Sequence, residues 1–277
     1  MISGILGISI AFIAATVSAA AYWLYYRDKE EHFYHLANRA FAVSGAAILF
    51  AVVLLYYNIF IHNFQLNYVY SYTSLQLSTY YLISTFWAGQ EGTFLLWLLF
   101  STVFGIILIR KLARKEPMAM SFLMMVQSFI LLILLKKSPF AMIWHTHAEA
   151  PVGFMPADGA SLNPLLQNPW MIIHPPIMFV GYSSTVVAFV LALNGMIKRD
   201  FMSWVKQARP WVVFTTLTLG AGIIMGGYWS YVTLGWGGYW AWDPVENASF
   251  VPWLFTAVLL HGLIIQSRQK GLVKTNL

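Results

Sequence analysis

Residues 235–247 read Gly-Trp-Gly-Gly-Tyr-Trp-Ala-Trp-Asp-Pro-Val-Glu-Asn and lie between two strongly apolar segments. Large flat side chains are provided by Trp236, Trp240 and Trp242. Gly237 and Gly238 let the backbone bend and let a ligand approach it closely. Such a surface fits a flat, apolar ring that carries a metal, of which heme is an example. An aromatic belt at a membrane interface is the alternative, but it does not explain three Trp and three Gly within eight residues.

The residues that follow these tryptophans are typical of a helix start. Asp243 and Asn247 are residue types that cap helices, and Pro244 suits the first helical position. Glu246 is interpreted in the same way, as a cap rather than as an acid–base catalyst. The stretch therefore predicts a ligand platform that leads directly into an apolar helix.

The composition of the chain is that of a polytopic membrane protein. Of its 277 residues, 59% are hydrophobic and 9% are charged, and the mean hydropathy is +0.66. Seven segments are long and apolar enough to span a bilayer: roughly 2–26, 40–61, 93–112, 118–135, 177–197, 211–231 and 248–266. The first is too long for a signal-peptide core, so we expect it to be a retained helix. We expect an all-α membrane protein that forms a single domain over residues 1–277.

The basic residues indicate topology rather than nucleic-acid binding. All but two of the 16 Lys and Arg fall on one side of the predicted spans. They are Arg27, Lys29, Arg39, Arg110, Lys111, Arg114, Lys115, Lys198, Arg199, Lys206, Arg209, Arg268, Lys270 and Lys274. Because cytoplasmic loops are enriched in Lys and Arg, we expect the N-terminus outside and the C-terminus in the cytoplasm. Residues 235–253 and the 136–176 loop then face outward; binding of anionic lipid or an acidic partner is the alternative use of the basic loops.

Two further segments are expected at the outer face. Residues 65–92 carry no Lys or Arg, and their apolar residues recur at roughly helical spacing, which predicts an amphipathic helix on the surface. Glu91 begins the third span, where its carboxylate is a candidate for anchoring the platform through hydrogen bonds or for moving protons. The chain has no cysteine, so any thiol chemistry at this face needs a second protein to supply the thiols.

Two of the seven histidines are candidate metal ligands. His174 precedes Pro175 and Pro176, which are expected to fix it at the outer mouth of the fifth span, and heme iron accepts imidazole as an axial ligand. His261 is the only histidine well inside a span, about 21 Å along the helix from Asn247, and ionisable residues there are by default functional candidates. The alternatives are a His174 bonded to a loop carbonyl and a His261 bonded to a neighbouring helix. At such different depths, the two histidines cannot share one iron.

The other histidines are expected to be structural or solvated. His145 and His147 lie two residues apart in the outer loop, a spacing that holds a metal only on an extended strand. His62 ends the second span at the outer face.

The run from Trp236 to Trp253 resembles the tryptophan-rich signature of heme-handling membrane proteins. Its ending, Asp-Pro-Val-Glu-Asn-Ala-Ser-Phe, is similar to the CcmF branch, the cytochrome c heme lyases. Residues 87–97 (Trp-Ala-Gly-Gln-Glu-Gly-Thr-Phe-Leu-Leu-Trp) and 162–182, which contain Asn-Pro-Trp-Met-Ile-Ile-His-Pro-Pro, resemble the same branch. The family usually has Trp where this chain has Tyr239, a change that keeps an aromatic ring.

The resemblance implies a function and a set of ligands. It implies a subunit of a holocytochrome c synthase in the bacterial or archaeal cytoplasmic membrane, which holds heme on the platform while thioether bonds form to the Cys-x-x-Cys-His motif of apocytochrome c. His174 then corresponds to the outward heme ligand and His261 to a ligand of an intramembrane heme b that keeps the outer heme b reduced.

The resemblance also implies partners. The second histidine of each site lies, in the family, beyond the point where this chain ends, so the chain resembles the N-terminal half of a split lyase completed by a second polypeptide. A heme chaperone, apocytochrome c and its thiol-reducing factors are the other implied partners. A heme transporter or channel, or a heme-binding respiratory membrane subunit without ligase activity, is the alternative function.

Overall fold

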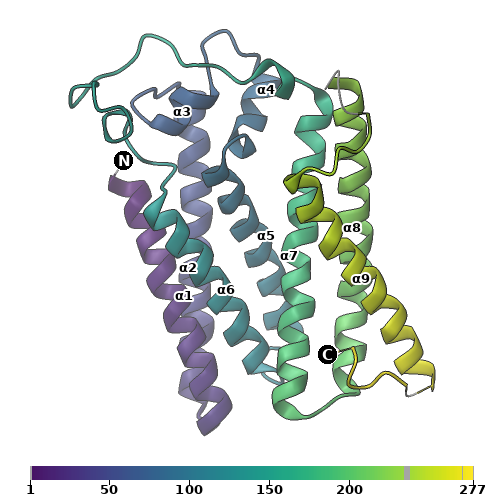
Figure 1. Cartoon of the computed structure of the whole chain (residues 1–277). Coiled ribbons are helices and arrows are strands. Elements are labelled where there is room, and N and C mark those ends of the chain that lie inside the picture. Colours follow the sequence, from purple (N-terminus) through teal and green to yellow (C-terminus); the bar gives the residue numbers. More distant parts are fainter. Residues whose placement is uncertain (1, 234–237, 270, 277) are drawn as a thin grey trace.

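The computed structural model shown in Figure 1 describes residues 2–233, 238–269 and 271–276. Seven helices in these ranges are long and apolar enough to cross a membrane. They are α1 (Ile2–Asp28), α2 (Glu31–Phe60), α5 (Gln90–Lys111), α6 (Pro117–Lys136), α7 (Pro169–Lys198), α8 (Ser203–Thr233) and α9 (Pro244–Gln269). Each coincides with one of the seven predicted spans, with the second and third predicted spans running one residue past the ends of α2 and α5. This confirms the predicted all-α class with seven spanning helices.

Most of the helices are longer than the spans predicted for them. Helix α2 begins at Glu31, nine residues before the predicted span, and helix α8 begins at Ser203 rather than near Trp211. Hydropathy marks only the part of a helix that suits hydrocarbon, whereas backbone hydrogen bonding continues into the polar interface. The difference therefore concerns the helix ends and not the number of crossings.

The helices form a bundle in which α7 joins two groups (Figure 1). On one side, α1 packs along both α2 and α6, and small side chains such as Ala11 and Ala15, both fully buried, let these helices approach closely. On the other side, α8 packs along α7, and α9 packs on α8 at the edge. In both α8 and α9, only 22% of the most apolar 18-residue stretch of the helix is buried, less than in the other spanning helices.

The segment predicted as one amphipathic helix is broken in the structure. It consists of the short helices α3 (Asn67–Tyr72) and α4 (Thr79–Ser84) and the 3₁₀ turn η1 (Thr85–Trp87). The break follows from hydrogen bonds to the long loop before α7: the Leu75 amide donates to the Asp158 carboxylate (2.9 Å), and the Ser161 amide donates to the Thr73 carbonyl (3.0 Å). This loop is irregular apart from the turns η2 (Ile143–His145) and η3 (Pro164–Leu166).

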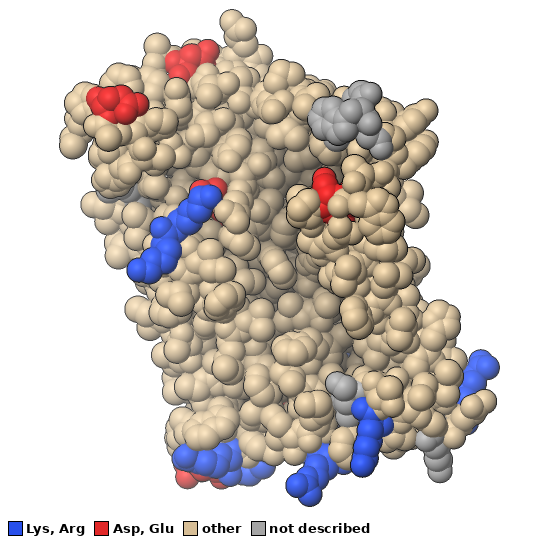
Figure 2. All heavy atoms as spheres, viewed as in Figure 1, with Lys and Arg blue, Asp and Glu red and all other residues tan. Residues whose placement is uncertain are grey.

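The two ends of the bundle differ in charge. Figure 2 shows Lys and Arg side chains gathered at the lower end of the visible face, below a broad band without charged residues. This is the end at which α1, α5, α7 and α9 finish. The long loop between α6 and α7, the helices α3 and α4, and residues 238–243 of the tryptophan-rich segment lie toward the other end, together with the start of α1 (Figure 1). The charge asymmetry read from the sequence is therefore an asymmetry between the ends of the folded molecule.

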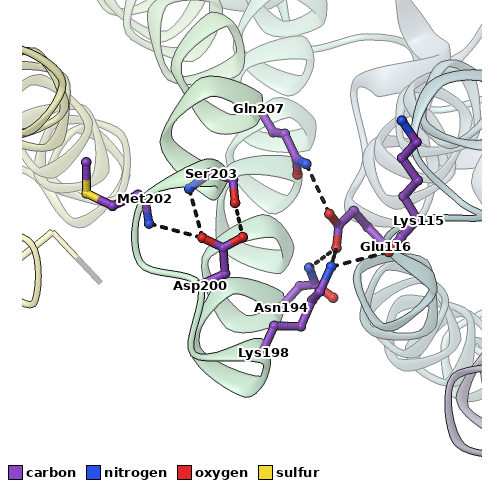
Figure 3. Close-up of polar contacts among 8 residues, drawn as sticks. All are labelled: Lys115, Glu116, Asn194, Lys198, Asp200, Met202, Ser203 and Gln207. Atoms are coloured by element: carbon purple, nitrogen blue, oxygen red, sulfur yellow. Dashed lines mark hydrogen bonds and ion pairs between the residues drawn. The ribbon is translucent and has the colours of Figure 1, made fainter.

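A buried carboxylate ties the two groups of helices together at the basic end (Figure 3). Glu116, which precedes α6, is 7% exposed. It accepts hydrogen bonds from Asn194 Nδ2 (2.6 Å) and Lys198 Nζ (2.8 Å) of α7, and from Gln207 Nε2 (3.1 Å) of α8. Burial raises the pKa of this carboxyl, but the three hydrogen bonds and the Lys198 charge lower it further, so the net pKa lies below its ordinary value. We call these four residues the Glu116 clamp.

Candidate functional site

The tryptophan-rich segment enters α9 through a reciprocal cap. The carboxylate of Asp243 accepts from the Glu246 amide (2.7 Å), and the carboxylate of Glu246 accepts from the amides of Ala241 (2.8 Å) and Asp243 (3.4 Å). This is a capping box with Pro244 in the first helical position. The predicted capping role of Asp243 and Glu246 is thus what the structure shows. Trp236 and Gly237 lie outside the described residues.

Backbone geometry turns the segment sharply before the cap. Gly238 has φ +60°, which glycine adopts without steric cost. Trp242 also has φ +60°, a conformation that is uncommon for a residue with a side chain. The side chain of Asn247 holds this turn, because its Nδ2 donates to the Trp242 carbonyl (3.0 Å). The result is a Trp242 side chain that is 67% exposed.

The aromatic side chains of this segment form an edge-to-face cluster. The rings of Trp240 and Trp242 lie 5.7 Å apart at 87°, and both stand edge-on to Phe250 of α9. The ring of Tyr239 stacks parallel to that of Tyr231 at 4.4 Å. The indole nitrogen of Trp240 is buried and has no partner among the described residues. The cluster therefore fixes Trp240 against the helices while leaving a donor available.

A hollow of about 530 Å³ lies between this segment and the helices, within the size range of ligand pockets. It is lined by Trp170, Ile223, Ile224, Met225, Gly227, Tyr228, Tyr239 and Trp240. The lining thus comes from α7, from α8 and from the tryptophan-rich segment, which are far apart in the sequence. The walls are almost entirely apolar and aromatic, which suits a flat apolar ligand.

His174 lies beside this hollow, one helical turn after Trp170 on α7. Its ring packs parallel to Trp229 of α8 at 5.9 Å. A Cβ atom at Gly226 would lie only 3.2 Å from His174 Nδ1, so the glycine allows this close packing. That nitrogen is buried and has no partner among the described residues. His174 is not itself among the residues that line the hollow.

The sequence-based explanation for the position of His174 was wrong. The proline pair does not begin the helix: α7 begins at Pro169, where the side chain of Asn168 caps the Trp170 amide (3.0 Å). Pro175 and Pro176 lie inside the helix. The cap at Asn168-Pro169 is a stronger start signal than the pair, because it combines a capping side chain with proline in the first helical position.

An internal proline frees a backbone carbonyl of α7, and a nearby tryptophan donates a hydrogen bond to it. Pro175 has no N–H, so the carbonyl four residues earlier, that of Met171, loses its helical donor. Trp87 Nε1 donates to this carbonyl at 3.2 Å. The motif that begins at Trp87 is thereby fixed to α7 three residues before His174.

The rest of that motif folds around a buried tyrosine. The hydroxyl of Tyr68 contacts the carbonyls of Thr85 (3.0 Å) and Phe86 (2.9 Å) and accepts from the Gly89 amide (3.1 Å). Burial raises the pKa of Tyr68 well above its ordinary value, so it stays a neutral hydroxyl. A side chain at Gly92 would overlap the Phe86 carbonyl and the Tyr68 hydroxyl, so this position requires glycine.

Glu91 is held by a lysine at the end of α6. Its carboxylate lies 3.5 Å from Lys137 Nζ, and its side chain is 14% exposed. Burial, followed by the negative charge of Glu91, raises the pKa of the neighbouring Tyr72. These contacts are with α3 and α6, and none is with the tryptophan-rich segment. The predicted anchoring of the platform by Glu91 stays a prediction.

His261 occupies a different environment, on an exposed side of α9. Its side chain is exposed, as are Phe255 and Val258, which precede it on the same helix. Its Nδ1 lies 2.7 Å from the Ala257 carbonyl, and since a carbonyl only accepts, Nδ1 carries the proton. In a neutral ring this hydrogen bond leaves Nε2 as the nitrogen that can bind iron. His174 is near the start of α7 and His261 is near the end of α9, so the two are at opposite ends of their helices.

The histidine pair in the long loop, His145 and His147, is not part of a metal-ligand cluster in the described part of the chain. His147 packs edge-on to Tyr70 at 5.9 Å and lies 3.7 Å from Glu149, and His145 packs against Trp144. Among the described residues there is no group of three or more His, Cys, Asp or Glu that could hold a metal ion. Metal binding at His174 or His261 therefore needs further ligands from a porphyrin ring or from a second protein.

Comparison with known proteins establishes the family. The sequence profile described as cytochrome c assembly protein matches residues 87–275, which is more than half of the chain and includes the motif at Trp87, His174 and the tryptophan-rich segment. The chain belongs to the cytochrome c assembly protein family. This agrees with the resemblance to the CcmF branch inferred from the motifs.

Individual relatives are similar over nearly all of this chain. This chain is 33% identical to the cytochrome c-type biogenesis protein CcmF of Pseudomonas fluorescens, and the match covers 98% of this chain. It is 35% identical to the cytochrome c-type biogenesis protein NrfE of Haemophilus influenzae, and that match covers 84% of this chain. The solved structure of the cytochrome c heme lyase CcmF matches 99% of this chain with a TM-score of 0.84 and 30% identity. These matches cover 40%, 37% and 44% of the relatives' own lengths. The activity of the longer proteins does not follow from a match of this extent.

Sequence reasoning missed three residues that shape the site. Tyr68 and Gly226 carry no local signal, because their partners are remote in the sequence. Trp87 lies in a recognised motif, but its hydrogen bond was not foreseen. The missing N–H of Pro175 was a usable signal, since it predicts a free carbonyl at position 171 in any helix that runs through it.

Proposed function

We propose that this chain holds heme for cytochrome c maturation at the end of the molecule that carries Trp240. The observation that carries the proposal is the aromatic hollow under the tryptophan-rich segment, with a histidine one turn away on α7. Heme is the substrate there. Its flat face suits the apolar walls, and His174, one turn from Trp170, would supply the imidazole that coordinates iron.

The role of the protein at this site is to position heme rather than to supply reacting groups. Addition of a cysteine thiol across a heme vinyl group forms one carbon–sulfur bond and moves the thiol proton to the other vinyl carbon. The chain has no cysteine, so the thiols come from the Cys-x-x-Cys-His segment of an apocytochrome c. Holding the two reactants in register lowers the barrier of the addition, because it replaces an encounter in solution by a reaction between aligned groups.

His261 fits a resident heme b in the membrane. The Nδ1 hydrogen bond to Ala257 orients the ring, and the other nitrogen points from an exposed part of α9. When bound, such a heme would pass electrons from an external reductant to the outer heme. Each site offers one histidine, so a second protein that adds a histidine to each is part of the proposal. A heme chaperone and thiol-reducing factors for the apocytochrome are proposed as further partners.

We further propose that residues 1–277 act as one heme-handling domain in the cytoplasmic membrane, with the basic end in the cytoplasm. Support comes from the positive-inside rule applied to the end where Lys and Arg gather. The platform and His174 then face outward, where apocytochromes are matured.

The experiment compares Trp240→Ala with Trp23→Ala in membranes that contain the full chain. Trp240 lines the hollow, whereas Trp23 is 46% exposed on α1 beneath the Arg27 guanidinium. By analogy with base–aromatic stacking, loss of Trp240 is expected to weaken heme retention by about 1–3 kcal/mol, and loss of Trp23 to leave it unchanged. Equal heme content in the two variants contradicts the proposed platform.

A further inference from the structure

A second hollow lies at the other end of the bundle, in the membrane-facing groove between α2 and α5. Its volume is about 580 Å³, and none of its lining residues belongs to the site described above. The floor is made of small residues on α2, among them Ala42, Gly45 and Ala46. The two helices pack closely at Gly45, because a Cβ atom there would lie 2.9 Å from Thr102 Cγ2.

The length of the groove matches one leaflet of a bilayer. Its α2 wall runs from Asn38 to Leu49 and its α5 wall from Leu99 to Arg110. Each wall is about 16 Å long at 1.5 Å per residue, close to half of the roughly 30 Å hydrocarbon core of a bilayer. The exposed side chains that line the α5 wall before Arg110, such as Val103 (45%) and Ile106 (42%), are apolar. A groove of this shape accommodates an extended acyl chain.

The groove ends in polar groups at the basic end of the molecule. Arg110 lines it, is exposed, and has no carboxylate within ion-pair distance among the described residues. Arg114, by contrast, is paired with Glu31 at 2.9 Å. The carboxamide oxygen of Asn38 accepts from the Tyr22 hydroxyl (2.7 Å), which leaves Nδ2 as the donor atom of this amide. A guanidinium and an amide donor at the headgroup level suit an anionic phosphate.

We propose that the groove between α2 and α5 binds an anionic phospholipid of the leaflet at the basic end, with one acyl chain over Ala42 and Ala46 and the phosphate on Arg110. The lipid fills a groove that the protein itself leaves open. It also fixes the depth of α2 and α5 relative to the bilayer, and through α5 the depth of the motif at Trp87.

The test uses the purified full chain and native mass spectrometry, with phosphatidylglycerol and phosphatidylcholine of identical acyl chains offered together. Phosphatidylglycerol is expected to be retained preferentially. Arg110→Gln is expected to lower its retention about fivefold, the change that corresponds to about 1 kcal/mol for one basic residue at an anionic surface. Lys111→Gln is the matched control, since it removes the same charge from the next residue, which does not line the groove.

A second pair of variants tests the acyl-chain part of the groove. Ala42→Leu combined with Ala46→Leu fills the floor and is expected to lower retention of both lipids, whereas Ala20→Leu, at an exposed position on α1, leaves it unchanged. Equal retention of the two lipids by the unmodified chain overturns the proposal. So does an equal effect of Arg110→Gln and Lys111→Gln, a comparison that holds even if the doubly substituted chain does not fold.

Discussion

Replacement of Trp87 by Phe tests whether the motif that begins there positions the turn of α7 that carries His174. The substitution removes the indole N–H that donates to the Met171 carbonyl at 3.2 Å. A hydrogen bond of this kind contributes about 1 kcal/mol net, and more when the carbonyl is left without another partner. The smaller ring adds a packing loss of its own, so the single variant does not isolate the hydrogen bond.

A double-mutant cycle with Pro175→Ala separates the two effects. Alanine at 175 restores the N–H that bonds to the Met171 carbonyl in a regular helix. In that background Trp87→Phe leaves no carbonyl unpaired, while the packing loss stays the same and cancels in the cycle. We expect Trp87→Phe to cost about 1 kcal/mol less when Pro175 is already Ala.

The assay is equilibrium unfolding of the full chain in mixed micelles, with heme retention measured on the same four proteins. Trp97→Phe is the matched control, because the Trp97 indole nitrogen is buried without a partner in the described structure and its loss should not couple to Pro175→Ala. Strict additivity of Trp87→Phe and Pro175→Ala refutes the inference that Trp87 satisfies the carbonyl freed by the proline.

Three further predictions concern other parts of the fold. Glu116→Gln should destabilise the chain by about 2 kcal/mol, since it weakens charge-assisted hydrogen bonds. Because the folded pKa of Glu116 lies below the ordinary 4.5, the stabilisation by the clamp is complete above pH 4.5 and is lost as the pH falls through the folded pKa. Acid unfolding curves of the variant should lack this loss of stability. Glu246→Ala should cost about 1 kcal/mol in thermal unfolding by removing half of the capping box, whereas an unchanged melting temperature contradicts a capping role. His261→Ala should abolish a membrane-embedded heme signal in redox titration while the outer site still accepts heme supplied reduced; persistence of that signal shows that His261 only packs.

The sequence predicted the fold well where the information is local. Apolar length determines a spanning helix, so each of the seven segments was found, and Asp243, Pro244 and Glu246 form the predicted cap because their partners lie within a few residues. The break between α3 and α4 depends on hydrogen bonds to residues 158–161, and no pattern within 65–92 reveals it. The start of α7 was misplaced because the proline pair was interpreted as a boundary although an earlier cap was available.

The site was predicted in part for the same reason. The residue types at 238–242 indicated an aromatic ligand surface, and the structure adds that their hollow is completed by Trp170 and by α8. That completion, and the packing of His174 against Gly226 and Trp229, join helices that are separated by long stretches of chain. Only the folded structure brings these residues together.

The most direct test of the account is rescue of a His174→Gly variant by free imidazole. The cavity left by the ring lies beside Gly226 and Trp229, so imidazole can re-enter it and coordinate the iron of bound heme. His62→Gly is the control, because His62 also has a buried, unpartnered Nδ1 but has no place in the proposed site. The account predicts that His174→Gly loses the outer heme spectrum and recovers it with imidazole, whereas His62→Gly keeps it throughout. An unchanged heme spectrum in His174→Gly, or a loss that imidazole does not restore, contradicts the assignment of His174 as the ligand.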